Sequence, residues 1–178
     1  MTRTNPQKQL VHVITGDGKG KTCSAVGMAV RALGRGMRVL LIQFLKPVDG
    51  SGETLLLKAE KRFSSLQYGT AAFVDRDRIQ PEDLRLASLG LKAAEKAVRG
   101  DEWDMVILDE VFPAADLGLV SVESLLRLID QKSDTVELVL TGRKAPSALI
   151  EKADLVSEIR EIKHPYRSGI PARKGIEF

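Results

Sequence analysis

The chain has 178 residues, the length of one domain, and 43% of them are hydrophobic while 29% are charged. Its 27 lysines and arginines are dispersed among 24 acidic residues, and aromatic residues make up only 4%, so neither a basic stripe nor a stacking platform for nucleic acid is evident. No apolar run approaches the ~18 residues that a membrane span needs, so we expect no membrane partner.

The predicted elements alternate between strands and helices. Residues 1–9 contain no apolar segment of a secretory signal, so we expect a flexible tail there and a cytoplasmic protein. Apolar, β-rich runs predict strands at 10–15, 38–44, 65–68, 104–108, 136–141 and 155–162. Helical spacing predicts helices at 21–33, 53–61, 81–99, 121–131 and 146–152. This alternation predicts one α/β domain over 1–178, a P-loop-type fold with a mostly parallel sheet of about six strands and helices on both faces.

The first predicted strand runs into the glycine-rich stretch "TGDGKGKT" at 15–22, which precedes a predicted helix. In this context backbone N–H groups converge on an anion, so the stretch predicts a phosphate loop, with its first glycine displaced from the usual spacing. The residues that permit the turn are Gly16, Gly18 and Gly20. Lys21 can reach the phosphates, Lys19 adds a second cation, and Thr22 offers a hydroxyl to Mg²⁺.

Two adjacent carboxylates, Asp109 and Glu110, end the buried run "MVILDE". A P-loop protein usually places the acid that positions Mg²⁺ here, and since the two side chains point differently, we expect only one to be close to the metal. Neither histidine has a visible serine or cysteine partner for nucleophilic catalysis. The residues alone leave open whether the bound polyphosphate is hydrolysed, transferred or expelled.

Several further segments make the chain familiar. "RALGRG", "VLLIQFLK", "LTGR", "ADLVSEI", "IKH" and the terminal "GIEF" follow the loop in family order. With them the chain resembles the P-loop ATP:corrinoid adenosyltransferases from Leu10 to Phe178. The resemblance implies an enzyme, acting as a homodimer, that binds MgATP, uses the Co(I) centre of a corrinoid as the nucleophile on the ribose 5′-carbon, and releases triphosphate. It further implies a role in cobalamin biosynthesis and a flavoprotein as electron donor.

By the same resemblance, the nucleotide-binding residues are Gly16, Asp17, Gly18, Lys19, Gly20, Lys21, Thr22 and Cys23. Lys21 is the main cation, and Thr22 and Glu110 contact Mg²⁺, with Asp109 beside them. Arg31, on the following helix, matches a family arginine near the nucleotide, although an arginine at such a position is also common as surface charge.

The chain departs from the family pattern in two places. Only about nine residues precede the first predicted strand, so closure over the nucleotide is expected to be weaker or to come from another element. Where the family has a Phe-x-Trp pair that displaces the lower ligand of the corrin, this chain has Phe73 and Asp75. A carboxylate does not exclude a polar ligand as an aromatic ring does, so we expect a different corrinoid preference or help from a neighbour such as Tyr68.

Two other functions remain open. A P-loop ATP hydrolase or regulator would release phosphate without a corrin, although no water-positioning residue is recognisable. The missing tryptophan also keeps open a third function, a corrinoid-binding carrier that has the same fold but has lost turnover.

Overall fold

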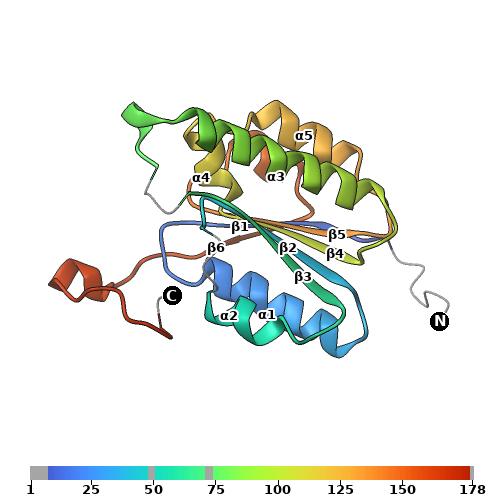
Figure 1. Cartoon of the computed structure of the whole chain (residues 1–178), viewed down its shortest axis with the longest axis horizontal. Helices are drawn as coiled ribbons and strands as arrows, with labels where there is room; N and C mark the ends of the chain where they lie inside the picture. Colours follow the sequence, from blue (N-terminus) through green and yellow to red (C-terminus); the bar gives the residue numbers. More distant parts are fainter. Residues whose placement is uncertain (1–7, 48–50, 71–73, 177–178) are drawn as a thin grey trace.

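The computed structural model describes residues 8–47, 51–70 and 74–176. They form a single six-stranded sheet in the order β3-β2-β4-β5-β1-β6, and every neighbouring pair is parallel (Figure 1). The predicted α/β class and the strand number are therefore confirmed.

The strands lie close to their predicted positions. They are β1 (Val11–Thr15), β2 (Val39–Phe44), β3 (Phe63–Tyr68), β4 (Met105–Asp109), β5 (Glu137–Thr141) and β6 (Leu155–Glu158). The last strand was expected to continue to residue 162, which is wrong. The carbonyl of Ile159 instead accepts a hydrogen bond from the Gly18 N–H (2.8 Å), so the chain turns toward the glycine-rich loop and leaves the sheet.

All five predicted helices are present. The α-helices are α1 (Lys21–Gly34), α2 (Gly52–Leu57), α3 (Pro81–Arg99), α4 (Val111–Asp116), α5 (Val122–Asp130) and α6 (Ser147–Lys152). The short helix α4 and two 3₁₀ turns, η1 (Arg76–Arg78) and η2 (Pro165–Ser168), were not predicted. Helix α4 is as short as the predicted α2 and α6, but its sequence "VFPAAD" is apolar at five of six positions and shows no helical period, and the two 3₁₀ turns have too few residues for one.

The helices cover both faces of the sheet. Helices α1 and α2 pack on one face, while α3, α4 and α5 lie on the other (Figure 1), where α6 also packs beside α5. Successive residues of β2 point to opposite faces of the sheet. Leu40 and Ile42 belong to the core under α3, and Val39 and Leu41 belong to the core under α1. The sheet is thus buried on both faces, as expected for parallel strands.

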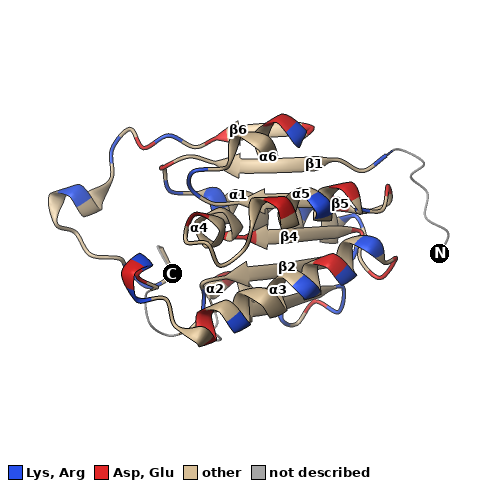
Figure 2. Ribbon diagram, turned by 90° about the horizontal axis from the view of Figure 1, so that it is seen from above, with Lys and Arg blue, Asp and Glu red and all other residues tan. Residues whose placement is uncertain are grey.

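Charged residues of both signs share the surface. Lysine and arginine lie beside acidic residues along α3 (Figure 2), where Arg85 pairs with Glu82. Within the described residues, no helix is both long enough and apolar enough to cross a membrane.

Candidate phosphate-binding site

The glycine-rich loop joins β1 to α1 and is held by the segment after β6. Gly16 has φ +102°, and a Cβ added to it would come within 2.4 Å of the Ile159 carbonyl oxygen. A Cβ on Gly18 would meet the Arg160 backbone at 2.7 Å. Glycine is therefore required at both positions, because the second chain segment passes too close for any side chain.

Lys21 is the first residue of α1, and its side chain is buried at the base of this loop. The ammonium donates to the Gly18 carbonyl at 2.7 Å, so it curls back under the turn. Burial lowers the pKa of Lys21, and the Arg143 charge lowers it further, whereas Glu110, Asp17 and Asp109 oppose the shift. The loop thus holds a desolvated cation whose charge an anionic ligand would stabilise.

A row of polar side chains crosses the sheet near the carboxyl ends of its strands. Gln43 is paired in register with Gln67 on one side and with Asp109 on the other. Side chains in a strand alternate between faces, and these residues share the α1 face with Leu41 and Ile107. The row therefore points toward the helix that begins with the loop.

Asp109 is the centre of this row and is fully buried. Its Oδ1 accepts from the hydroxyls of Thr141 (2.7 Å) and Thr22 (2.9 Å). Its Oδ2 accepts from Lys46 Nζ (2.6 Å) and Gln43 Nε2 (3.1 Å). Burial alone would raise the pKa of Asp109, but the Lys46 charge and these hydrogen bonds outweigh it, so the pKa is lowered and the carboxylate is ionised.

Glu110 follows β4 directly and adopts a left-handed conformation with φ 58°. Its N–H donates to the Thr141 hydroxyl at 3.2 Å, which fixes the turn against β5. Burial and the neighbouring Asp109 charge raise the pKa of Glu110, and Lys46, Lys21 and Arg143 oppose this. The two adjacent acids therefore have different surroundings: Asp109 is enclosed by protein donors, and Glu110 remains partly exposed.

The other predicted residues fall into three groups. Asp17, Lys19 and Cys23 are exposed on or beside the loop, and Lys19 Nζ donates to the Ile176 carbonyl at 2.9 Å. Arg31 lies in the last turn of α1, about 15 Å along the helix from Lys21, so the structure does not bring it to the loop. Phe73 lies outside the described residues.

The oxygen groups available near Lys21 suit a hard cation. The Thr22 hydroxyl and the Glu110 carboxylate are the kinds of ligand that Mg²⁺ takes, usually alongside phosphate oxygens and water. Within the described residues, no cluster of three or more His, Cys, Asp or Glu side chains forms a metal cage. The donor set therefore fits a cation that arrives with a polyphosphate better than one held by protein alone.

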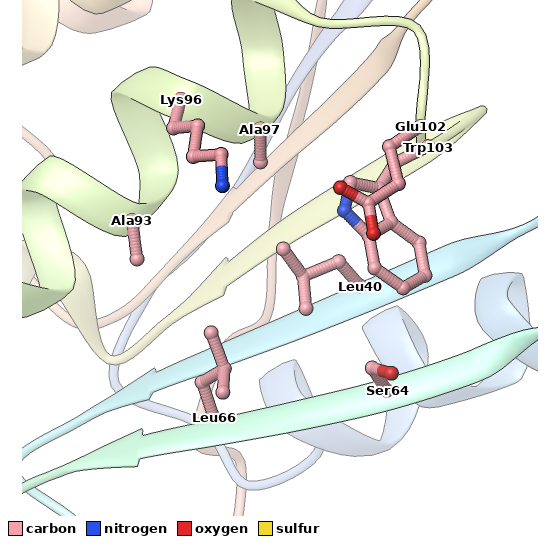
Figure 3. Close-up of a pocket in the computed structure, with 8 residues that line it drawn as sticks. All are labelled: Leu40, Ser64, Leu66, Ala93, Lys96, Ala97, Glu102 and Trp103. Atoms are coloured by element: carbon pink, nitrogen blue, oxygen red, sulfur yellow. The ribbon is translucent and has the colours of Figure 1, made fainter.

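Two of the pockets formed by the described residues lie beyond this loop. One, of about 500 Å³, is lined by residues just after β3 and at the start of α3, including Thr70, Val74 and Asp75. The other, of about 280 Å³, lies between α3 and the amino ends of β2 and β3, and its lining includes Leu40, Ser64 and Trp103 (Figure 3). Because loop and polar row lie at the carboxyl ends, only the first pocket opens at the same edge of the sheet.

Sequence reasoning missed three partners of Asp109, namely Gln43, Lys46 and Thr141. A signal was present, since the apolar runs "VLLIQF" and "LVLT" each contain a polar residue at or near the carboxyl end. A buried polar side chain in such a run needs a partner, and the period of two assigns it to the α1 face.

Comparison with known proteins gives one consistent family. The family model described as "ATP:corrinoid adenosyltransferase BtuR/CobO/CobP" matches residues 7–178. A corrinoid adenosyltransferase of Sinorhizobium sp is 36% identical over all of this chain and 84% of its own length. Another, of Pseudomonas aeruginosa, is 34% identical over 95% of this chain and 82% of its length. One of Escherichia coli is 29% identical over 100% of this chain and 90% of its length.

Proposed function

The chain belongs to the ATP:corrinoid adenosyltransferase family, and on that premise we propose that it transfers the 5′-deoxyadenosyl group of ATP to the Co(I) centre of a corrinoid and releases triphosphate. The observation that carries the proposal is the buried Lys21 below a turn in which only glycine fits at positions 16 and 18. Such a turn binds phosphate groups, and a polyphosphate is the leaving group of this reaction.

In this reaction the protein mainly has to align the Co(I) centre with the 5′-carbon and to stabilise the negative charge on the leaving triphosphate. The Co(I) electron pair forms the bond to the 5′-carbon, the carbon–oxygen bond breaks, and the triphosphate keeps the bonding pair. No proton is taken in this step, which agrees with a site that offers a cation, hydroxyls and carboxylates. The role of Lys21 is to stabilise the charge that builds up on the departing triphosphate.

We assign the Mg²⁺ contacts to Thr22 and Glu110. When bound, the metal would neutralise part of the triphosphate charge. Asp109 orients the Thr22 hydroxyl through their 2.9 Å hydrogen bond, so it acts through Thr22. Asp17, Lys19, Gly20 and Cys23 are assigned to the surroundings of the nucleotide.

The corrinoid is assigned to the carboxyl edge near the end of β3. The pocket of about 500 Å³ there is lined by Asp75, which stands where the family has tryptophan. Asp75 is exposed and its side chain accepts a hydrogen bond from the Asp77 N–H, so it forms the start of the turn η1. This favours a corrinoid preference different from that of the tryptophan-bearing members.

The proposal extends to the oligomeric state of the protein, its location in the cell and its electron donor. A cytoplasmic homodimer that receives electrons from a flavoprotein is the arrangement that the family resemblance implies. Exposed apolar side chains on α1 and α2, namely Val30, Leu55 and Leu56, support a protein contact on that face. Sedimentation velocity would test the dimer, and a monomer at micromolar concentration would refute it.

Product analysis tests the proposed activity. The protein is incubated with MgATP and chemically reduced cobalamin, and the absorbance spectrum of adenosylcobalamin is followed. Formation of the adenosylated corrin supports the transferase. ADP and phosphate formed without corrin would favour a hydrolase, and corrin binding without any product would favour a carrier.

A further inference from the structure

The Lys46 ammonium forms an ion pair with Asp109, one of the two acids beside which a P-loop protein is expected to bind magnesium. Its Nζ is 2.6 Å from Asp109 Oδ2, and that carboxylate has no exposed surface. Lys46 comes two residues after the end of β2, and its side chain is only 29% exposed. The ion pair therefore forms inside the site.

Asp109 has no acceptor position left for a metal. A carboxylate accepts about four hydrogen bonds, and Asp109 has four donors around it: Thr141 on Oδ1, Gln43 and Lys46 on Oδ2, and the Thr22 hydroxyl near both oxygens. A divalent ion at bonding distance would have to displace one of these donors. It would also stand next to the Lys46 charge, and like charges this close repel each other.

The backbone is built to hold Lys46 in this place. Leu45, directly before it, adopts φ 58°, a left-handed conformation that is unfavourable for leucine. The chain after β3 packs against this bend, because a Cβ on Gly69 would lie 2.3 Å from the Lys46 nitrogen. The Leu45 N–H also donates to the Tyr68 carbonyl at 3.0 Å. Backbone strain that a packed neighbouring segment holds in place is typical of a functional position.

We propose that the Lys46 ammonium is a built-in cation that excludes divalent metal from Asp109 in the nucleotide-free protein, so that the metal enters the site only together with the nucleotide. The inference rests on the magnesium site of the proposed function and restricts the direct protein contacts of the metal to Thr22 and Glu110. It gives Lys46 a positioning role, because its hydrogen bond to Asp109 Oδ2 also holds that carboxylate in place against the Thr22 hydroxyl.

The test is Mn²⁺ binding to nucleotide-free protein, followed by the loss of the electron paramagnetic resonance signal of free Mn²⁺. The wild-type chain is expected to bind Mn²⁺ weakly. Lys46→Met and Lys46→Gln are both expected to bind it at least about tenfold more tightly, because the competing charge is gone. The gain should vanish in the double variant Lys46→Met/Asp109→Asn. Unchanged affinity in both single variants, or a gain that survives in the double variant, would overturn the proposal.

Two further variants control for other causes of a change in Mn²⁺ affinity. Lys58→Met removes the same charge from an exposed residue at the end of α2 and should leave Mn²⁺ affinity unchanged. An equal gain there would mean a general charge effect and would refute the assignment to Lys46. If Lys46→Met does not fold, Lys46→Gln decides, because its amide can still donate to Asp109. This Mn²⁺ assay contains neither nucleotide nor corrin, so its result does not depend on whether the protein transfers adenosyl groups. The product analysis described above tests that activity separately.

Discussion

Single side chains set the charge balance at the phosphate loop. Lys21 is held in the folded protein with a lowered pKa, first because it is buried and second because Arg143 is near. A polyphosphate would reverse this shift, since a negative ligand favours the protonated amine. A polyphosphate bound at the loop would therefore gain from this desolvated cation.

Replacing that cation tests its role. Lys21→Ala should lower adenosyl transfer by about 10²–10³-fold, the loss typical when one donor to a developing anion is removed. The fold should persist, because the Lys21 ammonium donates its hydrogen bond to the Gly18 carbonyl, which belongs to the same loop. Turnover is measured from the corrin spectrum and the fold from circular dichroism. Turnover at the wild-type rate would refute the loop assignment.

Replacing Glu110 by glutamine should make the folded protein more stable but its use of Mg²⁺ less effective. Its pKa is raised by burial and by Asp109, so the ionised form destabilises the folded protein at neutral pH, and this penalty fades as the pH falls through the raised pKa. Glu110→Gln is therefore expected to raise the melting temperature at pH 7, with a difference that shrinks toward acid pH. It should also raise the Mg²⁺ concentration needed for turnover. Thermal unfolding across pH and a magnesium titration measure the two effects, and a lower melting temperature at pH 7 would contradict the first.

Among the secondary-structure elements, the loop between β1 and α1 depends on the segment that follows β6. The Gly18 N–H donates to the Ile159 carbonyl, and the Ile159 N–H donates to the Thr15 carbonyl, each at 2.8 Å. The loop is thus clamped from outside as well as by its own turn. This clamp ends the last strand early, which is why the longer strand expected from the apolar pattern does not form.

Two glycines near each other in the sequence should respond oppositely to alanine. Gly16→Ala places a Cβ 2.4 Å from the Ile159 oxygen at φ +102°, so it should destabilise the fold by about 1–3 kcal/mol. Gly27→Ala, in the middle of α1 with nothing within 4 Å of the new Cβ, should stabilise it by about 0.5–1 kcal/mol. Urea unfolding measures both, and equal effects would mean that the loop is not clamped.

The elements and the loop could be predicted from the sequence because both depend on local patterns. Strands and long helices follow from periodicity, and the phosphate loop follows from "TGDGKGKT" between a strand and a helix. The enclosure of Asp109 could not be predicted. It depends on which strands flank β4, and β2 and β5 became its neighbours only through the sheet order. Lys46 was missed for a further reason, because a left-handed leucine leaves no signature in the sequence.

For the whole molecule, the sheet order assembles the site from distant parts of the chain. Strand β1 carries the loop, while β4, between β2 and β5, carries the acids, so Thr22 meets Asp109 from 87 residues away. Nucleotide sites in open parallel sheets lie at the carboxyl ends of the strands, and the glycine-rich loop and the two acids lie at that edge here. A fold that brings a loop cation, a hydroxyl and two distinct carboxylates to one edge is suited to binding and releasing a polyphosphate.

The fate of the phosphate chain is the most direct measurement. Phosphorus nuclear magnetic resonance of a reaction containing the protein, MgATP and a Co(I) corrinoid should show inorganic triphosphate appearing in the same amount as adenosylated corrinoid, with both lost in Lys21→Ala. Formation of ADP with phosphate, or of adenosylated corrinoid without an equal amount of intact triphosphate, would contradict a loop that holds a triphosphate leaving group.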